Sequence, residues 1–177
     1  MYFRGGIFPA QWDFFRTYGP SAKARFDHHV PPPSDQHRSI LYAAHYVSTC
    51  IAEVFQEDRT IDRSFNQPAL AGFRTTRDVF LLDLRGPWST AAGASMAIST
   101  GRKDFARGWS RSIYEAYPNV EGLWYSSSMD ANNPAVALYE RAQRCIPVTQ
   151  IFDEPLTHPS LLGALVQLKD RFGYELV

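Results

Sequence analysis

Short apolar stretches bounded by turn residues alternate with helical patterns along this chain, and this alternation most limits its fold. Strands are expected where four to eight apolar or aromatic residues cluster between turn residues. Such segments lie at residues 39–44, 79–84, 122–125, 135–139 and 147–152. Because helical patterns separate them without a regular strand–helix–strand repeat, we predict an α+β fold with one mixed β-sheet and flanking helices.

Four segments have the composition of helices. They are residues 48–58, residues 89–100, the stretch from Asp104 to Pro118 and the stretch from Pro159 to Gly173. Ser48 suits the N-cap of the first. Pro159 and Gly173 suit the first turn and the end of the last. The last helix is expected to bury its apolar residues, which are Leu161, Leu162, Leu165, Val166 and Leu168.

The length and charge of the chain exclude several classes of protein. Its 177 residues suit one domain, so we assign residues 1–177 to a single domain. Lysine and arginine number 18, as do aspartate and glutamate, for a net charge of +0. Because proteins that wrap nucleic acid carry a basic excess, direct nucleic acid binding is not expected. No apolar run approaches the roughly 18 residues of a membrane helix, so no membrane partner is expected.

The two cysteines, Cys50 and Cys145, lie in apolar stretches. A buried free thiol is the commoner state of such residues, and a single disulfide would make no framework. The N-terminus has no apolar signal core behind its charge. These features favour a reducing cytoplasm as the location of the protein.

The histidines His28, His29, His37 and His45 lie close together in sequence. A metal site needs acidic or cysteine ligands at compatible spacing, as in HExxH, and the sequence has none. We therefore predict no metal and interpret these histidines as structural or exposed side chains. Prolines 31–33 and the polar residues that follow to position 38 predict a surface loop.

Motifs of the common nucleotide-binding and hydrolase folds are missing from the sequence. There is no GxxxxGK[ST] loop, no GxGxxG loop and no GxSxG elbow. This argues against P-loop NTPases, Rossmann dehydrogenases and α/β-hydrolases. Aromatic residues make up 14% of the chain, which raises the expectation of a pocket that stacks on a ligand.

Glu53 is the most informative acidic residue, because in its apolar segment a carboxylate either faces solvent or is held in a pocket. Tyr42 precedes it by eleven residues, and a strand, a turn and a helix between them would bring both side chains to one cleft. Arg25 suits a phosphate or a carboxylate, although a surface ion pair is the commoner use of a single arginine. The serines 126–128 follow an apolar segment, either as a polar turn or with a hydroxyl in a cleft.

Taken in order, several short segments resemble the RES domain family. They are Ala24-Arg25-Phe26-Asp27, Ile40-Leu41-Tyr42-Ala43-Ala44, Ala52-Glu53-Val54 and Gly122-Leu123-Trp124-Tyr125-Ser126-Ser127, with Asn133 behind. The resemblance implies a fold similar to that of ADP-ribosyltransferases. The best-known members are toxins of bacterial RES–Xre toxin–antitoxin pairs, which consume NAD. Ala24 and Asp27 depart from the Gly and Asn common in the family, and these departures bear on the shape of the NAD entrance.

The resemblance implies that the chain cleaves the nicotinamide–ribose bond of NAD, which is then a substrate and not a cofactor. Glu53 would stabilise the positive charge that develops on the ribose. Arg25 would pair with the pyrophosphate, and Tyr42 would stack on or orient the nicotinamide ribose. Ser127, with Ser126 as the alternative, would hydrogen-bond the nicotinamide amide or a ribose hydroxyl.

Other functions stay open at this point. The same residues would serve a protein ADP-ribosyltransferase, and a non-catalytic binding module could keep the fold and the pocket. The acceptor could be water, phosphate or a protein. The family implies an Xre-type antitoxin as partner, and a homo-oligomer also stays open. If the catalytic interpretation holds, the implied side chains should line one cleft, with His28 and His29 near its mouth.

Overall fold

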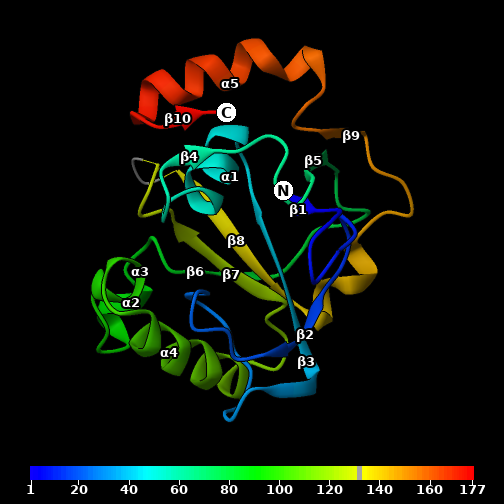
Figure 1. Ribbon diagram of the computed structural model, residues 1–177. Helices are drawn as coiled ribbons and strands as arrows, with labels where there is room; N and C mark the ends of the chain where they lie inside the picture. Colours follow the sequence, from blue (N-terminus) through cyan, green and yellow to red (C-terminus); the bar gives the residue numbers. More distant parts are fainter. Residues whose placement is uncertain (131–132) are drawn as a thin grey trace.

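A five-stranded sheet forms the centre of the computed structural model, which describes residues 1–130 and 133–177 (Figure 1). In spatial order its strands are β2 (Arg16–Gly19), β3 (Ser34–Ala44), β8 (Pro134–Tyr139), β7 (Gly122–Ser126) and β6 (Leu81–Asp83). Neighbouring strands are antiparallel, except that β6 and β7 run parallel. The predicted α+β class with a mixed sheet is therefore confirmed.

Two smaller sheets and the helices surround this sheet. β1 (Tyr2–Phe3), β5 (Pro68–Gly72) and β9 (Phe152–Pro155) form an antiparallel sheet, and β4 (Thr60–Ile61) pairs in parallel with β10 (Glu175–Leu176). The helices are α1 (Val47–Val54), α2 (Trp88–Ala91), α3 (Ala97–Thr100), α4 (Lys103–Ala116), the 3₁₀ helix η1 (Glu140–Cys145) and α5 (Pro159–Phe172). Figure 1 shows α4 and α5 at opposite ends of the molecule, with α1 beneath α5.

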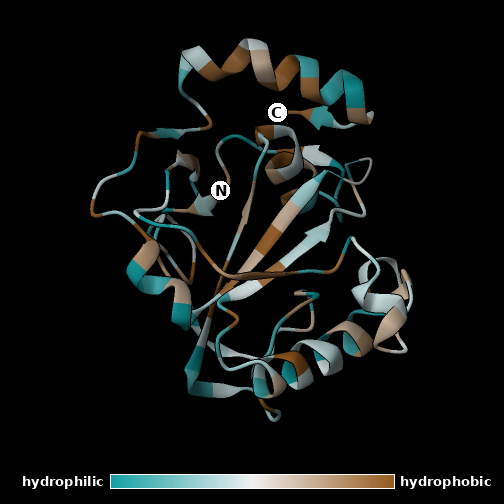
Figure 2. Cartoon of the chain, turned by 180° about the vertical axis from the view of Figure 1, so that it is seen from behind, coloured by the Kyte–Doolittle hydropathy of each residue, from teal (hydrophilic) through white to brown (hydrophobic). Residues whose placement is uncertain are grey.

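Two hydrophobic clusters hold these layers together. α4 covers one face of the large sheet, where Ile113 packs with Leu123 of β7 and Tyr139 of β8. The second cluster joins α1 to α5 through the buried side chains of Ile51 and Leu165. Hydrophobic and hydrophilic bands alternate along α5 in Figure 2, as expected for a helix that packs along one side only.

Several predicted elements are confirmed. The predicted strand at 39–44 is the second half of β3, and the one at 135–139 lies in β8. The predicted first helix is α1, which ends at Val54, earlier than expected. Its N-cap is Tyr46, so the predicted cap at Ser48 is wrong, and the Ser48 hydroxyl bonds Asp130 instead. α5 begins at Pro159 and stops at Gly173, whose left-handed backbone (φ 63°) closes the helix as predicted. Both cysteines are free thiols.

Three local predictions are wrong. Residues 34–38 begin β3 instead of forming a loop. Most of their side chains are polar and exposed where β3 pairs with β2, so the sequence shows no alternation of apolar and polar residues there. Residues 147–151 form no strand. Val148 is 98% exposed, so the apolar residues of this segment do not indicate a buried strand. The expected helix at 89–100 splits into α2 and α3 around Gly93, which has a φ of 81°. The sequence Asn132-Asn133-Pro134 predicts a turn, whose first residue lies outside the described residues.

The buried face of α5 is narrower than predicted. Leu165 is buried, and Leu161 and Leu168 are half-buried, but Leu162 and Val166 are exposed. Because α5 packs against the rest of the chain on one side only, apolar residues on its flanks reach solvent. No helix of residues 1–130 and 133–177 is long and apolar enough to cross a membrane.

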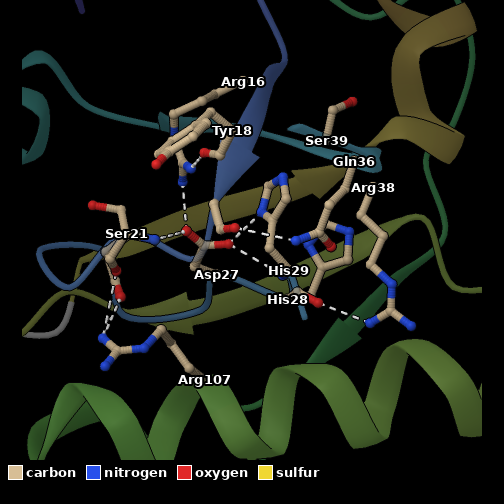
Figure 3. Close-up of polar contacts among 12 residues, drawn as sticks. Arg16, Tyr18, Ser21, Asp27, His28, His29, Gln36, Arg38, Ser39 and Arg107 are labelled. Carbon is tan, nitrogen blue, oxygen red and sulfur yellow. Dashed lines mark hydrogen bonds and ion pairs between the residues drawn. The ribbon is translucent and has the colours of Figure 1, made fainter. Parts of the chain in front are cut away.

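A buried polar cluster beside β2 contains both adjacent histidines (Figure 3). His28 and His29 are 0% exposed, so the expectation that they lie at a cleft mouth is wrong, and they are structural side chains. The buried carboxylate of Asp27 accepts hydrogen bonds from His29 Nδ1 at 2.5 Å, the Ser21 N–H at 2.6 Å and Arg16 Nη2 at 2.7 Å. Burial acts to raise the pKa of Asp27, but these bonds outweigh burial and hold the pKa below its usual range.

His28 joins this cluster to Glu140 at the start of η1. Glu140 accepts hydrogen bonds from His28 Nε2 at 3.3 Å, the Tyr114 hydroxyl at 2.5 Å and the Ser39 N–H at 3.1 Å. Burial lowers the pKa of His28 more than Glu140 raises it, so His28 is neutral at pH 7 and donates through Nε2–H. Burial acts to raise the pKa of Glu140, but the hydrogen bonds lower it to about 2.

Glu140→Gln is expected to destabilise the protein in a pH-dependent way. The pKa of Glu140 is lowered from 4.5 to about 2 in the folded protein, so its stabilisation is complete above about pH 5 and is lost as the pH falls toward 2. Urea unfolding should give a loss of about 2 kcal/mol at pH 7, which shrinks below pH 5. Glu175→Gln, at an exposed position in β10, is the control. An equal loss at pH 7 and at about pH 3 would contradict this account.

Candidate functional site

A strand, a turn and a helix bring Tyr42 and Glu53 to one pocket. Tyr42 lies near the end of β3, the chain turns at His45 and Tyr46, and Glu53 lies on the second turn of α1. Both side chains line a cavity of ≈ 310 Å³, and Arg25 lines it from the segment that follows β2. The structure therefore brings together three of the four residues singled out from the sequence.

Ser127, the fourth residue, lies behind Glu53. Its hydroxyl donates a hydrogen bond of 2.5 Å to Glu53 Oε1 and accepts bonds of 3.1 Å from the backbone N–H groups of Met129 and Asp130. Ser127 is buried and, unlike Ser128, is not among the described residues that line the cavity. Ser126 is also buried and outside that lining set. The structure thus connects Ser127 to Glu53. It does not place Ser126 or Ser127 on the cavity wall, where the expected contact with a ligand would be made.

The two carboxylate oxygens of Glu53 have different surroundings. Oε1 accepts the short bond from Ser127, whereas Oε2 has a 3.4 Å contact with Gln56 Nε2. The same Gln56 amide donates at 2.6 Å to the carbonyl oxygen of Glu53. Since a carboxylate oxygen can accept more than one hydrogen bond, Glu53 is fixed on one side and can still accept a bond from a ligand hydroxyl on the other.

Arg25 is a half-buried cation that holds a neighbouring loop in place. Its Nη1 donates to the carbonyl oxygen of Gly101, just before α4, at 2.5 Å. Burial lowers the pKa of Arg25, and the nearby charge of Glu53 acts in the opposite direction, so the guanidinium stays charged. Among the described residues, no carboxylate forms an ion pair with Arg25.

Three further cations, all missed in the sequence, line the same cavity: Arg16, Lys23 and Lys103. Arg16 is neutralised by Asp27, and Lys23 forms a 2.8 Å ion pair with Glu57. Lys103 is half-buried at the first position of α4 and has no ion pair with the part of the chain that the structure describes. Lys23, two residues before Arg25, could have been noticed in the sequence. Lys103 has no local signal, because contacts of Arg25 with Gly101 and of Arg107 with residues 21–24 bring the start of α4 to the pocket.

These residues make the pocket electrically unbalanced. Four cationic side chains line it against one carboxylate, that of Glu53, although the chain as a whole has a net charge of +0. Two of the cations, Arg25 and Lys103, form no ion pair among residues 1–130 and 133–177, and the nearest opposite charges are those of Glu53 and Glu57. A half-buried site with such an excess of positive charge favours an anionic ligand.

Tyr42 lines the pocket, but its hydroxyl is enclosed by the protein. Its hydroxyl oxygen is buried and has no hydrogen-bond partner in the described residues. Burial raises the pKa of Tyr42 well above its ordinary value, so the phenol stays protonated. Among the described residues, His, Cys, Asp and Glu side chains form no group of three that could hold a metal ion. The groups that the pocket presents to a ligand are therefore cations, the Tyr42 side chain and one carboxylate.

A larger and mostly apolar cavity of ≈ 2170 Å³ adjoins the pocket. It shares Arg16, Tyr42 and Cys50 with the pocket and is lined further along by aromatic side chains such as Trp12 and Phe73. The pocket alone lies at the small end of the range for ligand sites, about 300–1,000 Å³. The two cavities adjoin along β3, where they share these residues.

Comparison with known proteins gives one match. A family model described as RES domain matches residues 6–158 of the 177 residues. The match contains Arg25, Tyr42, Glu53 and Ser127 and ends directly before α5. No curated protein and no solved structure matches the chain, so the similarity of its fold to ADP-ribosyltransferases stays a prediction.

The charge of the pocket predicts that inorganic pyrophosphate stabilises the protein against thermal unfolding. A ligand that binds only the folded state at 100 times its Kd stabilises it by about 2.7 kcal/mol. Arg25→Ala and Lys103→Ala should each reduce the shift in melting temperature, because each removes an unpaired cation from the pocket. Lys169→Ala on α5 is the control. An unchanged shift in both pocket variants would show that pyrophosphate binds elsewhere.

Proposed function

Because the chain belongs to the RES domain family, we propose that it is an NAD-consuming enzyme that breaks the nicotinamide–ribose bond. The observation that carries the proposal is the pocket itself. It combines one carboxylate, oriented by a 2.5 Å bond from Ser127, with two cations that have no ion pair among the described residues. NAD presents a pyrophosphate and a reacting ribose in one extended molecule, which matches these two kinds of group.

The carboxylate of Glu53 is suited to the difficult part of this reaction. When the bond between nicotinamide and the ribose C1′ breaks, its electron pair leaves with the nicotinamide, which departs as a neutral molecule. Positive charge then spreads over C1′ and the ring oxygen, as in glycoside hydrolysis. A fixed carboxylate stabilises this charge and accepts a hydrogen bond from a ribose hydroxyl. The oxygen of a water molecule then adds to C1′ and releases one proton.

The other side chains of the site would bind and orient the dinucleotide. Arg25 and Lys103 would pair with the pyrophosphate, and Tyr42 would stack on or orient the nicotinamide ribose. We assign Ser127 a positioning role, because its hydroxyl bonds Glu53 and lies behind the cavity wall. This replaces the ligand contact that the family resemblance implied for Ser127 or Ser126.

Transfer of ADP-ribose to a protein is the second candidate, and the adjoining cavity favours it. The exposed side chains of Tyr46 and Val47 line that cavity next to the pocket, where an acceptor segment of a protein could lie. The two reactions share the same bond cleavage and differ only in the acceptor. Family membership also supports a toxin-type role with an Xre-type antitoxin as partner.

Release of nicotinamide from NAD by the purified protein tests the proposal. Glu53→Gln keeps the shape of the side chain but removes its charge, so kcat should fall by about 10²–10³-fold, the usual size of one lost electrostatic stabiliser. Glu175→Gln, at an exposed position in β10, should leave the rate unchanged. Retained melting temperature would show that the fold persists. A Glu53→Gln protein as active as the unmodified protein would refute the assignment of Glu53.

ADP-ribose as the sole second product would identify water as the acceptor, whereas ADP-ribose attached to an added protein would favour transfer. A protein that binds NAD without releasing nicotinamide would instead be the non-catalytic module. Measuring nicotinamide and the ADP-ribose moiety in the same reaction distinguishes these three outcomes.

A further inference from the structure

A buried carboxylate outside the pocket ties the segment after β7 to two helices. The side chain of Asp130 is 0% exposed, and its Oδ2 accepts hydrogen bonds of 2.8 Å from the hydroxyls of both Ser48 and Thr49 in α1. Its Oδ1 forms a 2.7 Å ion pair with Arg171 Nη2 of α5. One side chain therefore connects three segments that are distant in the sequence.

The segment 127–130 holds α1 at two points on the same side. Thr49 and Glu53 are four residues apart, so they lie one above the other on the helix surface. Asp130 binds the first through its carboxylate, and Ser127 binds the second through its hydroxyl. The backbone N–H of Asp130 also donates to the Ser127 hydroxyl at 3.1 Å. Movement of Asp130 would therefore disturb the bond that orients Glu53.

Arg171 supplies the outer support of this arrangement from a helix that the family match does not include. The match ends at residue 158, and α5 begins at Pro159. Just beyond α5, the buried Tyr174 donates a 3.3 Å hydrogen bond to the carbonyl oxygen of Ala52, the neighbour of Glu53. The C-terminal segment thus contacts both the helix that carries Glu53 and the segment that carries Ser127.

We propose that Asp130 is a positioning residue for Glu53 and that Arg171, from the C-terminal helix, sets the activity of the site by holding Asp130 in place. The proposal rests on the proposed function for its catalytic consequence. The physical reason is that Asp130 is buried, and a buried carboxylate keeps its place only while donors and a positive charge surround it. Without Arg171, two hydroxyl donors and the Asn133 side chain remain around the charge. The segment 127–130 then becomes less firmly fixed.

The effect should appear in kcat more than in KM. Arg25, Tyr42 and Lys103 bind elsewhere on the pocket wall and do not contact Asp130, so binding of the dinucleotide should change little. Misplacement of a reacting group by about 1 Å can cost about 10²-fold in rate. We therefore expect kcat for nicotinamide release to fall by about 10²-fold in Asp130→Asn and by about tenfold in Arg171→Gln.

Two further variants separate positioning from general stability. Arg171→Lys keeps the charge without the planar fork and should recover part of kcat. Lys169→Gln changes a charge on the same helix two residues away and should leave kcat unchanged. The positioning role would be overturned if kcat and kcat/KM fell in proportion to the melting temperature in all four variants, including Lys169→Gln. If Asp130→Asn does not fold, the Arg171 variants decide, because Arg171 is half-exposed at the surface.

Hydrogen exchange gives a readout that does not depend on activity. The N–H groups of Met129 and Asp130 both donate to the Ser127 hydroxyl, so they should exchange faster in Arg171→Gln than in the unmodified protein or in Lys169→Gln. Unchanged exchange would overturn the proposal, and so would faster exchange with an unchanged kcat. If the unmodified protein released no nicotinamide, the proposed function would fail on its own, and exchange would still decide whether Arg171 holds the segment.

Discussion

The hydrogen bond from Ser127 to Glu53 joins the two halves of the site, and its 2.5 Å length requires that β7 and α1 keep a fixed relation. The central sheet provides that relation. β3 and β7 pair with opposite edges of β8, so the end of β7 and the start of α1, which follows β3, lie at the same edge of the sheet. Ser127 can reach Glu53 because the register of three strands places both segments there.

Charged side chains are neutralised in the buried polar cluster but not at the wall of the pocket. In the interior, Asp27 neutralises Arg16 and fixes His29, which leaves that polar cluster balanced. At the pocket, Arg25 uses one donor on the Gly101 carbonyl and keeps its charge, and Lys103 follows on α4. Since burying a balanced pair costs less than burying an unpaired charge, the unpaired cations lie at the half-exposed cavity wall and not in the core. Ligand binding would supply the missing negative charge.

The sequence predicted the parts of the site that are local and missed those that depend on distant contacts. Tyr42 and Glu53 could be paired because a strand, a turn and a helix link them within a short stretch. Lys103 could not be found, because contacts of residues 21–25 with Gly101 and Arg107, which are distant in the sequence, bring it to the pocket. The strand at 34–38 was missed because edge positions with exposed polar side chains have no hydrophobic periodicity. The prediction that His28 and His29 lie near a cleft mouth is wrong because the polar partner of His28, Glu140, is distant in the sequence and encloses the cluster.

The two departures from the family pattern also find different explanations in the structure. Ala24 lines the pocket next to Arg25, so its methyl group affects the shape of the cavity directly. Asp27 is buried away from the cavity lining and holds Arg16, whose side chain does line the pocket. An asparagine at this position would remove the charge that balances Arg16, and it would lose the bonds accepted by one of the two oxygens, because an amide NH2 group cannot accept. By neutralising Arg16, Asp27 reduces the positive charge that the pocket offers to a ligand. Arg25 and Lys103 then provide the positive charge that remains.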